Sequence, residues 1–202
     1  MQDSKEHIVL IASKLFLQKN FKEVTMKEIV KETGLSKGAF YHYFKSKEQL
    51  FLEVLNYFFS HVSRDYKNYS KESLNEFYHD YANETINLTK KYLAKFEDEL
   101  NEVTITMNYF SLVFDALKLF PEFRERIISE FNDEIGYWTE AVERARRNGE
   151  ISSPMSDKEI AEIFMYLSDG VGMHMIMRGE TIENMVKPFE NLWNKFYEQI
   201  KV

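Results

Sequence analysis

Residues 25–47, TMKEIVKETGLSKGAFYHYFKSK, constrain the fold of this chain most strongly, because they encode two short capped helices around a glycine turn. Thr25 is followed three residues later by Glu28, a capping box in which each side chain can bond to a backbone N–H of the other residue. Gly34 can take the left-handed conformation that ends a helix, and Ser36 can cap the helix that follows. The pattern predicts a helix-turn-helix.

The second helix of this motif is only about two turns long, so few of its positions can serve packing. Phe40 and Phe44 are four residues apart, and we expect them to face the core. The other side chains then face solvent near the start of a helix, where donors and small residues can approach a phosphate or a base edge. Ser46 with Gln49 predicts another capping box, which starts a longer helix.

Residues 21–50 resemble the DNA-binding head of the TetR family of bacterial one-component transcriptional regulators. Members of this family tend to show a threonine opening the second helix, a glycine in the turn, a small-residue recognition helix, and an aromatic run before a lysine. In this chain the matching residues are Thr25, Gly34, Lys37-Gly38-Ala39, Tyr41-His42-Tyr43-Phe44 and Lys47. Val30 departs from the pattern, since alanine is common there. The resemblance implies a homodimer that binds a palindromic operator and a body whose small-molecule effector releases it, most simply a repressor.

We expect DNA contacts from the solvent-facing side of this motif. Lys37 is the best candidate base reader, because lysine can donate to the O6 and N7 acceptors of guanine in the major groove. Gly38 permits close approach, and Thr25 and Lys47 can hold the phosphate backbone from either side. If the motif bound no DNA, these residues would be ordinary surface. The candidate DNA-binding residues are Thr25, Lys27, Ser36, Lys37, Gly38, Ala39, Tyr41, His42, Tyr43 and Lys47.

Charge is distributed unevenly along the chain. Residues 1–50 contain nine lysines, no arginine and six acidic residues, a net charge of +3, whereas the remainder contains 17 basic and 27 acidic residues, a net charge of −10. A polyanion is attracted to the first part and repelled by the second. An acidic body can also serve solubility alone, and the sequence leaves both interpretations open.

Helical periodicity continues through the rest of the chain, which contains only seven glycines and three prolines in all. We therefore predict an all-α fold with a three-helix DNA-binding head in residues 1–47 and a larger helical bundle for effector binding and dimerisation in residues 48–202. The first helix is expected to run from a Ser4 cap to about Lys19, and a helix from Ser46 to about Asp65 is expected to belong to both domains. The absence of cysteine excludes disulfides and thiolate metal sites. The polar N-terminus and the lack of an apolar run of roughly 18 residues predict a cytoplasmic protein.

Apolar stripes in the body predict a ligand cavity and a subunit interface. A small apolar or aromatic effector is expected between helices, and the acidic body adds a cationic effector as an option. The last two helices carry more apolar surface than one packing face needs, which predicts a dimer interface. For His174, a hydrogen-bonded core histidine is the competing interpretation. The candidate pocket residues are Tyr81, Met107, Phe110, Phe114, Trp138, Phe164 and His174; the candidate interface residues are Met165, Ser168, Gly172, Met175, Phe189, Trp193 and Phe196.

Catalysis has no candidate residues in this sequence. Glu76 and His79 have the spacing of half a carboxylate di-iron site, but no second Glu-x-x-His follows, so a metal site is not expected. No Gly-rich phosphate loop, serine elbow or Cys/His pair occurs, and we predict neither an enzyme nor a cofactor. The alternative function is an all-helical interaction or scaffold protein that keeps the head fold without sequence-specific DNA binding.

Overall fold

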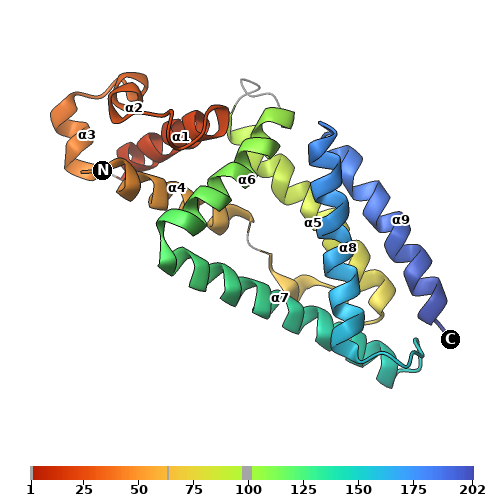
Figure 1. The fold of residues 1–202 in the computed structure, drawn as a ribbon. Helices are drawn as coiled ribbons and strands as arrows, with labels where there is room; N and C mark the ends of the chain where they lie inside the picture. Colours follow the sequence, from red (N-terminus) through yellow and green to blue (C-terminus); the bar gives the residue numbers. More distant parts are fainter. Residues whose placement is uncertain (1, 63, 97–101) are drawn as a thin grey trace. The chain divides into compact units, whose positions relative to one another are not determined.

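A computed structural model of the chain describes residues 2–62, 64–96 and 102–202 (Figure 1). These residues form nine α-helices and two short 3-10 turns, which confirms the predicted all-α class. No helix in this part of the chain has the length and apolar character that a membrane span requires. The helices are α1 (Gln2–Gln18), α2 (Met26–Thr33), α3 (Lys37–Tyr43), α4 (Lys47–Val62), α5 (Leu74–Leu93), α6 (Glu102–Leu119), α7 (Pro121–Arg147), α8 (Asp157–Met177) and α9 (Ile182–Ile200).

Some helix ends differ from the predicted ones. Ser4 lies inside α1, which begins at Gln2, so its predicted role as a cap is wrong. α4 ends at Val62 rather than near Asp65, whose carboxylate instead accepts a hydrogen bond in a 3-10 turn. Pro188 lies within α9, because the helix already begins at Ile182.

The chain divides into two compact units by its internal contacts. Unit 1 comprises residues 1–63 and 91–121, and unit 2 comprises residues 64–90 and 122–202. All of α4 and α6 therefore belong to the same unit as the head, and the helix that crosses from one unit to the other is α5. These units describe packing, so the predicted functional boundary after residue 47 stays a prediction.

An aromatic cluster forms the centre of unit 1, where α1 packs against α2, α4 and α6. The ring of Phe51 lies 5.1 Å from that of Phe16 and 4.6 Å from that of Phe21. Phe120, which follows α6, lies 6.1 Å from Phe51. These large apolar side chains remove much surface from water and hold the head helices on a rigid base.

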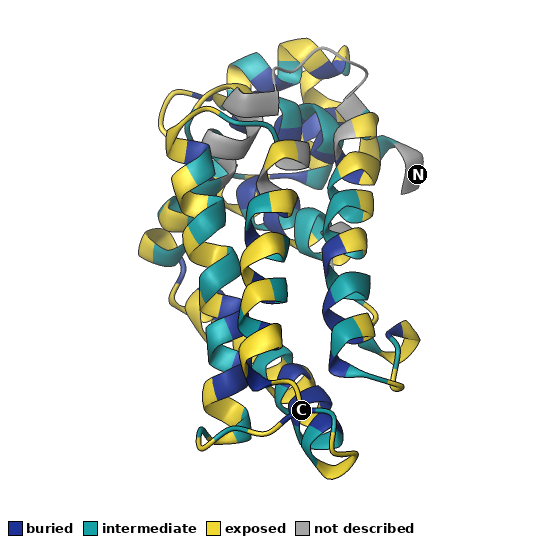
Figure 2. Cartoon of the chain, turned by 90° about the vertical axis from the view of Figure 1, so that its right-hand side faces the viewer, coloured by how far each residue is buried: buried dark blue, intermediate teal, exposed yellow. Residues whose placement is uncertain are grey.

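Two fully buried tryptophans form the centre of unit 2. Trp138 of α7 and Trp193 of α9 lie 5.3 Å apart, and Phe164 of α8 packs against both. The indole N–H of Trp193 donates to the carbonyl of Phe164 at 2.7 Å, which fastens α9 to α8. Buried positions line one side of these helices and exposed positions the other (Figure 2).

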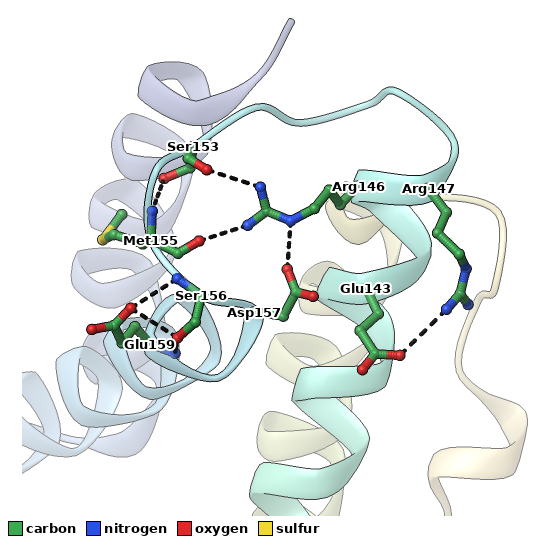
Figure 3. A network of polar contacts seen from close by, with 8 residues as sticks. All are labelled: Glu143, Arg146, Arg147, Ser153, Met155, Ser156, Asp157 and Glu159. Atoms are coloured by element: carbon green, nitrogen blue, oxygen red, sulfur yellow. Dashed lines mark hydrogen bonds and ion pairs between the residues drawn. The ribbon is translucent and has the colours of Figure 1, made fainter.

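A single guanidinium shapes the connection between α7 and α8 (Figure 3). Arg146, in the last turn of α7, donates to the carbonyl of Ser153 at 2.9 Å and to that of Met155 at 2.7 Å. Its Nε donates to Asp157 at 2.6 Å, at the start of α8. The predicted capping box at Ser156 forms in both directions. One charged side chain thus donates hydrogen bonds to carbonyls of the connection, which lie outside any helix.

Candidate nucleic-acid interface

Local turn chemistry builds the predicted helix-turn-helix. The hydroxyl of Thr25 accepts from the backbone N–H of Glu28 at 3.2 Å, and that of Ser36 accepts from Ala39 at 3.2 Å. Gly34 has φ 67°, the left-handed conformation that closes the C-terminal end of α2. α2 and α3 are therefore each capped at the N-terminus and joined by a turn that favours glycine.

Two capping boxes depart from the prediction in their second bond. The carboxylate of Glu28 binds the ammonium of Lys19 rather than reaching back to Thr25. This hydrogen bond lowers the pKa of Glu28 and raises the pKa of Lys19 relative to their ordinary values. The side chain of Gln49 accepts from the backbone of Lys45 at 2.9 Å, one residue before the predicted position. In both cases the first capping hydrogen bond is kept, and the second side chain binds a nearby residue instead, Lys19 for Glu28 and Lys45 for Gln49.

The packing face of α3 is the predicted one. Phe40 and Phe44 are 0% and 1% exposed. His7 of α1 donates from Nε2 to the carbonyl of Thr33 at 3.1 Å and so satisfies the end of α2, a contact that the sequence pattern did not reveal. Buried rings thus anchor α3 in the core, and α1 holds the end of α2, the helix before it.

The solvent-facing side of α3 carries most of the predicted DNA contacts. Lys37 has no hydrogen-bond or ion-pair partner within the described chain, so its ammonium is available for binding. Tyr43 is half-buried rather than fully exposed, and its ring lies 5.3 Å from that of His42. The predicted residues that are exposed are Thr25, Lys27, Ser36, Lys37, Gly38, Ala39, Tyr41 and His42.

Gly38 has no packing reason to lack a side chain. A Cβ added at this position would meet no heavy atom within 4 Å. Gly38 lies within α3, where glycine is less favourable than alanine because it has more backbone freedom to lose. The missing side chain leaves this face of α3 open to close approach by another molecule.

Lys47 has a structural role that the sequence pattern did not reveal. Its ammonium donates to the carbonyls of Phe21 at 2.7 Å and Val24 at 2.8 Å, and it lies 4.3 Å from the Phe21 ring centroid. The side chain therefore ties the connection between α1 and α2 to the start of α4. A phosphate contact by Lys47 stays a prediction, and the same ammonium would have to serve both partners.

Comparison with known proteins identifies the head. Residues 8–54 match the family model described as bacterial regulatory proteins, tetR family. This segment belongs to the TetR family of DNA-binding heads. It is 40% identical over 98 residues to the uncharacterized HTH-type transcriptional regulator YerO of Bacillus subtilis, and 38% identical over 53 residues to the HTH-type transcriptional repressor NemR of Escherichia coli. These matches cover 48% and 26% of this chain, and they span only 32% and 27% of the two relatives' lengths.

The TetR-family fold extends beyond the matched head. The crystal structure of the MbdR regulator from Azoarcus sp. CIB superimposes with a TM-score of 0.70, over 94% of this chain and 96% of that chain. The two sequences are 20% identical, so the superposition shows a shared fold and no more.

The predicted effector residues fall into both units. Tyr81, Trp138 and Phe164 come together in unit 2, with ring centroids 5.2 Å apart for Tyr81 and Trp138 and 5.3 Å apart for Trp138 and Phe164. Phe110 and Phe114 belong to unit 1, and Phe114 is 50% exposed. Tyr81, Trp138 and Phe164 therefore form a contiguous aromatic cluster within unit 2.

Two further pocket candidates lie elsewhere. His174 is exposed, so its interpretation as a core histidine is wrong, and its place in a pocket wall stays a prediction. At this end of α8 the buried residue is Ile176, which shows that the core stripe read from the sequence does not continue to His174. The side chain of Met107 lies outside the described part of the chain.

Several predicted interface residues are buried inside the protomer. Met165, Phe189 and Trp193 are 6%, 5% and 0% exposed, so they belong to the core of the protomer, and a role for them in a subunit interface stays a prediction. The apolar surface that motivated the assignment is covered by the packing of α8, α9 and their neighbours in unit 2. The remaining candidates are half-buried: Ser168, Gly172, Met175 and Phe196.

Exposed apolar side chains also occur on α8 and on α9. Tyr166, Met173 and Met177 are 59%, 36% and 66% exposed. Their spacings of seven and four residues place them on one side of α8. Leu192 of α9 is 41% exposed.

The Glu76 and His79 side chains have partners of their own. Glu76 accepts from the hydroxyl of Ser70, and Nδ1 of His79 bonds to the carbonyl of Asn75 at 2.7 Å. Across the described residues no three metal-ligating side chains form a group that could hold an ion.

A small cavity of about 100 Å³ opens in unit 2, and no sequence motif indicated it. Aromatic and charged side chains both line it. The lining residues are Tyr66, Lys67, Tyr69, Lys71, Phe77, Tyr137, Glu140 and Arg144.

Proposed function

We propose that this chain is a DNA-binding transcriptional repressor that binds a palindromic operator as a homodimer and is released by a small-molecule effector. The observation that carries the proposal is the exposed face of α3. An unpaired ammonium at Lys37 lies next to the side-chain-free Gly38, on a helix that Phe40 and Phe44 anchor in the core. A rigid helix with a donor and an open backbone is suited to enter the major groove.

Charge supports DNA as the partner. The net charge of +3 over residues 1–50 attracts the phosphate backbone, and the acidic remainder of the chain is repelled by it. This distribution orients the head toward a duplex before any base is read. An interaction or scaffold protein that does not bind DNA would need neither the charge distribution nor the unpaired Lys37.

We infer that dimerisation uses the exposed face formed by Tyr166, Met173, Met177 and Leu192. Apolar side chains exposed together on two helices are costly in water and are typical of a subunit interface. A two-fold axis at this face would pair α8 and α9 with their copies. Two heads are then available for the two halves of a palindrome.

The repressor role and the effector are the least direct parts of the proposal. The relative NemR is named a repressor, and its 38% identity lies within 53 residues. Among the structural neighbours, a regulator from Saccharomonospora viridis was solved in complex with choline, which shows that this fold can hold a small organic cation. An effector need only bind one state of the regulator more tightly than the other to shift DNA binding.

Selection of bound sites from a random duplex pool tests the proposal. We expect enrichment of one palindrome whose half-sites are centred about 34 Å apart, one turn of DNA, because two recognition helices related by a two-fold axis must enter successive major grooves. Recovery of unenriched sequence after repeated rounds would favour the scaffold alternative instead.

A further inference from the structure

Arg64 is a buried cation at the start of unit 2, two positions after Val62, the last residue of α4. Its side chain is 18% exposed. Nη2 donates to the hydroxyl of Thr85 at 3.0 Å, and Tyr69 is among the side chains that interact electrostatically with the guanidinium. Nη1 is buried and has no hydrogen-bond partner among the residues that the structure describes. The two N–H groups of Nη1 therefore have no acceptor among these residues.

An aromatic and acidic cage surrounds this guanidinium. Its Cζ atom lies 3.9 Å from the centroid of the Tyr81 ring, which is a cation–π geometry. The hydroxyls of Tyr66 and Tyr81 donate to Oε1 of Glu134 at 2.8 and 2.9 Å, and so they fix the carboxylate beside the cation. Burial raises the pKa of both tyrosines above the ordinary value, so both remain donors at neutral pH. We call Tyr66, Tyr69, Tyr81 and Glu134 the Arg64 cage.

Arg64 and Glu134 lie close together in the cage but form no hydrogen bond through Nε. Nε of Arg64 lies 3.9 Å from Oε1 of Glu134, which is too long for a hydrogen bond. A charge-assisted pair between a planar cation and a carboxylate has donor–acceptor distances of about 2.8 Å and two parallel bonds. The guanidinium stacks on Tyr81 without making that pair. A planar cation that is not tethered to the backbone could do both.

We propose that the Arg64 cage is the site for a planar aromatic cation of the amidinium class, and that Arg64 occupies this site until the ligand displaces it. The ligand's amidinium would stack on Tyr81 and bind Glu134 through two N–H groups. Its aryl group would meet Trp138, whose ring lies 5.2 Å from that of Tyr81. Unit 2 contains 14 basic and 21 acidic residues, a net charge of −7, which attracts cations.

Displacement of Arg64 also supplies a regulatory step, which rests on the proposed function. Arg64 anchors the chain immediately beyond α4, so its release frees the end of the helix that follows the recognition motif. A ligand that competes with Arg64 therefore acts on α4 through the covalent chain. If the cation weakens operator binding tenfold, linkage requires the operator to weaken cation binding tenfold.

Titration of the full chain with benzamidine, in the absence of DNA, tests the site itself. Fluorescence of the buried tryptophans and calorimetry both report binding, since Trp138 adjoins Tyr81. Arg64→Met should bind benzamidinium at least tenfold more tightly than wild type, because the internal competitor is gone. Arg64→Lys keeps a competing positive charge and should stay within about threefold of wild type. Glu134→Gln keeps an acceptor for both tyrosines but removes the charge, and it should weaken binding at least tenfold.

Controls separate this proposal from its alternatives. Arg147→Met removes a 67% exposed guanidinium elsewhere in unit 2 and should leave binding unchanged. Benzoate has the same ring and the opposite charge, and it tests the basic rim of the neighbouring cavity. Binding of benzoate in place of benzamidinium, or equal or weaker benzamidinium binding by a folded Arg64→Met, would overturn the proposal. If Arg64→Met does not fold, undiminished binding by Glu134→Gln overturns it equally.

The same titration distinguishes a failed site from a failed function. If the variants bind benzamidinium as predicted but the protein binds no duplex, the cation site is supported and its regulatory role is contradicted. If the protein binds its operator but not benzamidinium, the proposed function is supported and the cation site is contradicted. With both activities present, the selected duplex should weaken benzamidinium binding by the factor that benzamidinium weakens duplex binding.

Discussion

At Gly38 one missing methyl group has opposite consequences for folding and for binding. Gly38→Ala should raise the free energy of unfolding by about 0.5–1 kcal/mol, because alanine is the better helix former and its Cβ meets nothing in the head. The same Cβ should obstruct close approach to the duplex and weaken binding about tenfold, or 1.4 kcal/mol. Chemical denaturation and duplex titration measure the two effects.

Gly136→Ala is the matched control for this prediction. Gly136 lies within α7, and an added Cβ there also meets no heavy atom within 4 Å. This variant should gain similar stability and bind duplex as the wild type does. Undiminished duplex binding by Gly38→Ala would show that the open face of α3 does not approach DNA.

At Lys47 the ammonium holds the backbone that leads into the recognition motif. Lys47→Ala should lower the free energy of unfolding by about 1.5–3 kcal/mol, since hydrogen bonds from a charged donor to the Phe21 and Val24 carbonyls are lost. Lys31→Ala removes the same charge from an 84% exposed side chain and should change stability by less than about 0.5 kcal/mol. Denaturation curves compare the two; equal stabilities would remove the structural role of Lys47.

At the scale of elements, Arg146 sets the connection between α7 and α8. Arg146→Met should lower the free energy of unfolding by about 2 kcal/mol, because two loop carbonyls and one carboxylate lose a charged donor. The adjacent Arg147 reaches only Glu143, at 3.3 Å, and is largely exposed, so Arg147→Met should be nearly neutral. Thermal unfolding of the two variants measures the difference. Similar losses of stability in both would contradict the structural role of Arg146.

Elements of the head could be predicted because their determinants are local. The caps at Thr25 and Ser36 act over three residues, and the turn at Gly34 depends on one backbone angle. Contacts between distant residues left no such signal. The carbonyls that Lys47 binds lie 26 and 23 residues away, and the cage around Arg64 joins α5 to α7.

The apolar stripes of α8 and α9 show the same limit for whole faces. Their periodicity identified both helices correctly, but a stripe does not reveal which neighbour covers it. Trp193, an expected subunit contact, is covered within the protomer by Phe164 and Trp138. The exposed Met173 and Met177 were not among the predicted interface residues. The exposed apolar face of α8 therefore became visible only once the packing of unit 2 was known.

At the scale of the whole molecule, the exposed face of α8 should control assembly. Met173→Arg should give monomers at micromolar concentration, since a charge would be buried without a partner at the two-fold interface. Phe131→Arg is the control, because Phe131 is 58% exposed on α7, away from that face. Sedimentation equilibrium measures both. A monomeric wild type, or a dimeric Met173→Arg, would contradict this choice of interface.

The central claim is that α3 reads DNA sequence, and fluorescence anisotropy on a selected duplex and a scrambled duplex of equal length tests it most directly. We predict a Kd of about 10⁻⁸ M or tighter for the selected duplex, with a steep loss of affinity on adding salt. Lys37→Ala should cost about 1–3 kcal/mol on the selected duplex and much less on the scrambled one. Lys71→Ala, which removes an exposed charge from unit 2, should change neither. Equal affinity of the wild type for both duplexes would contradict the claim.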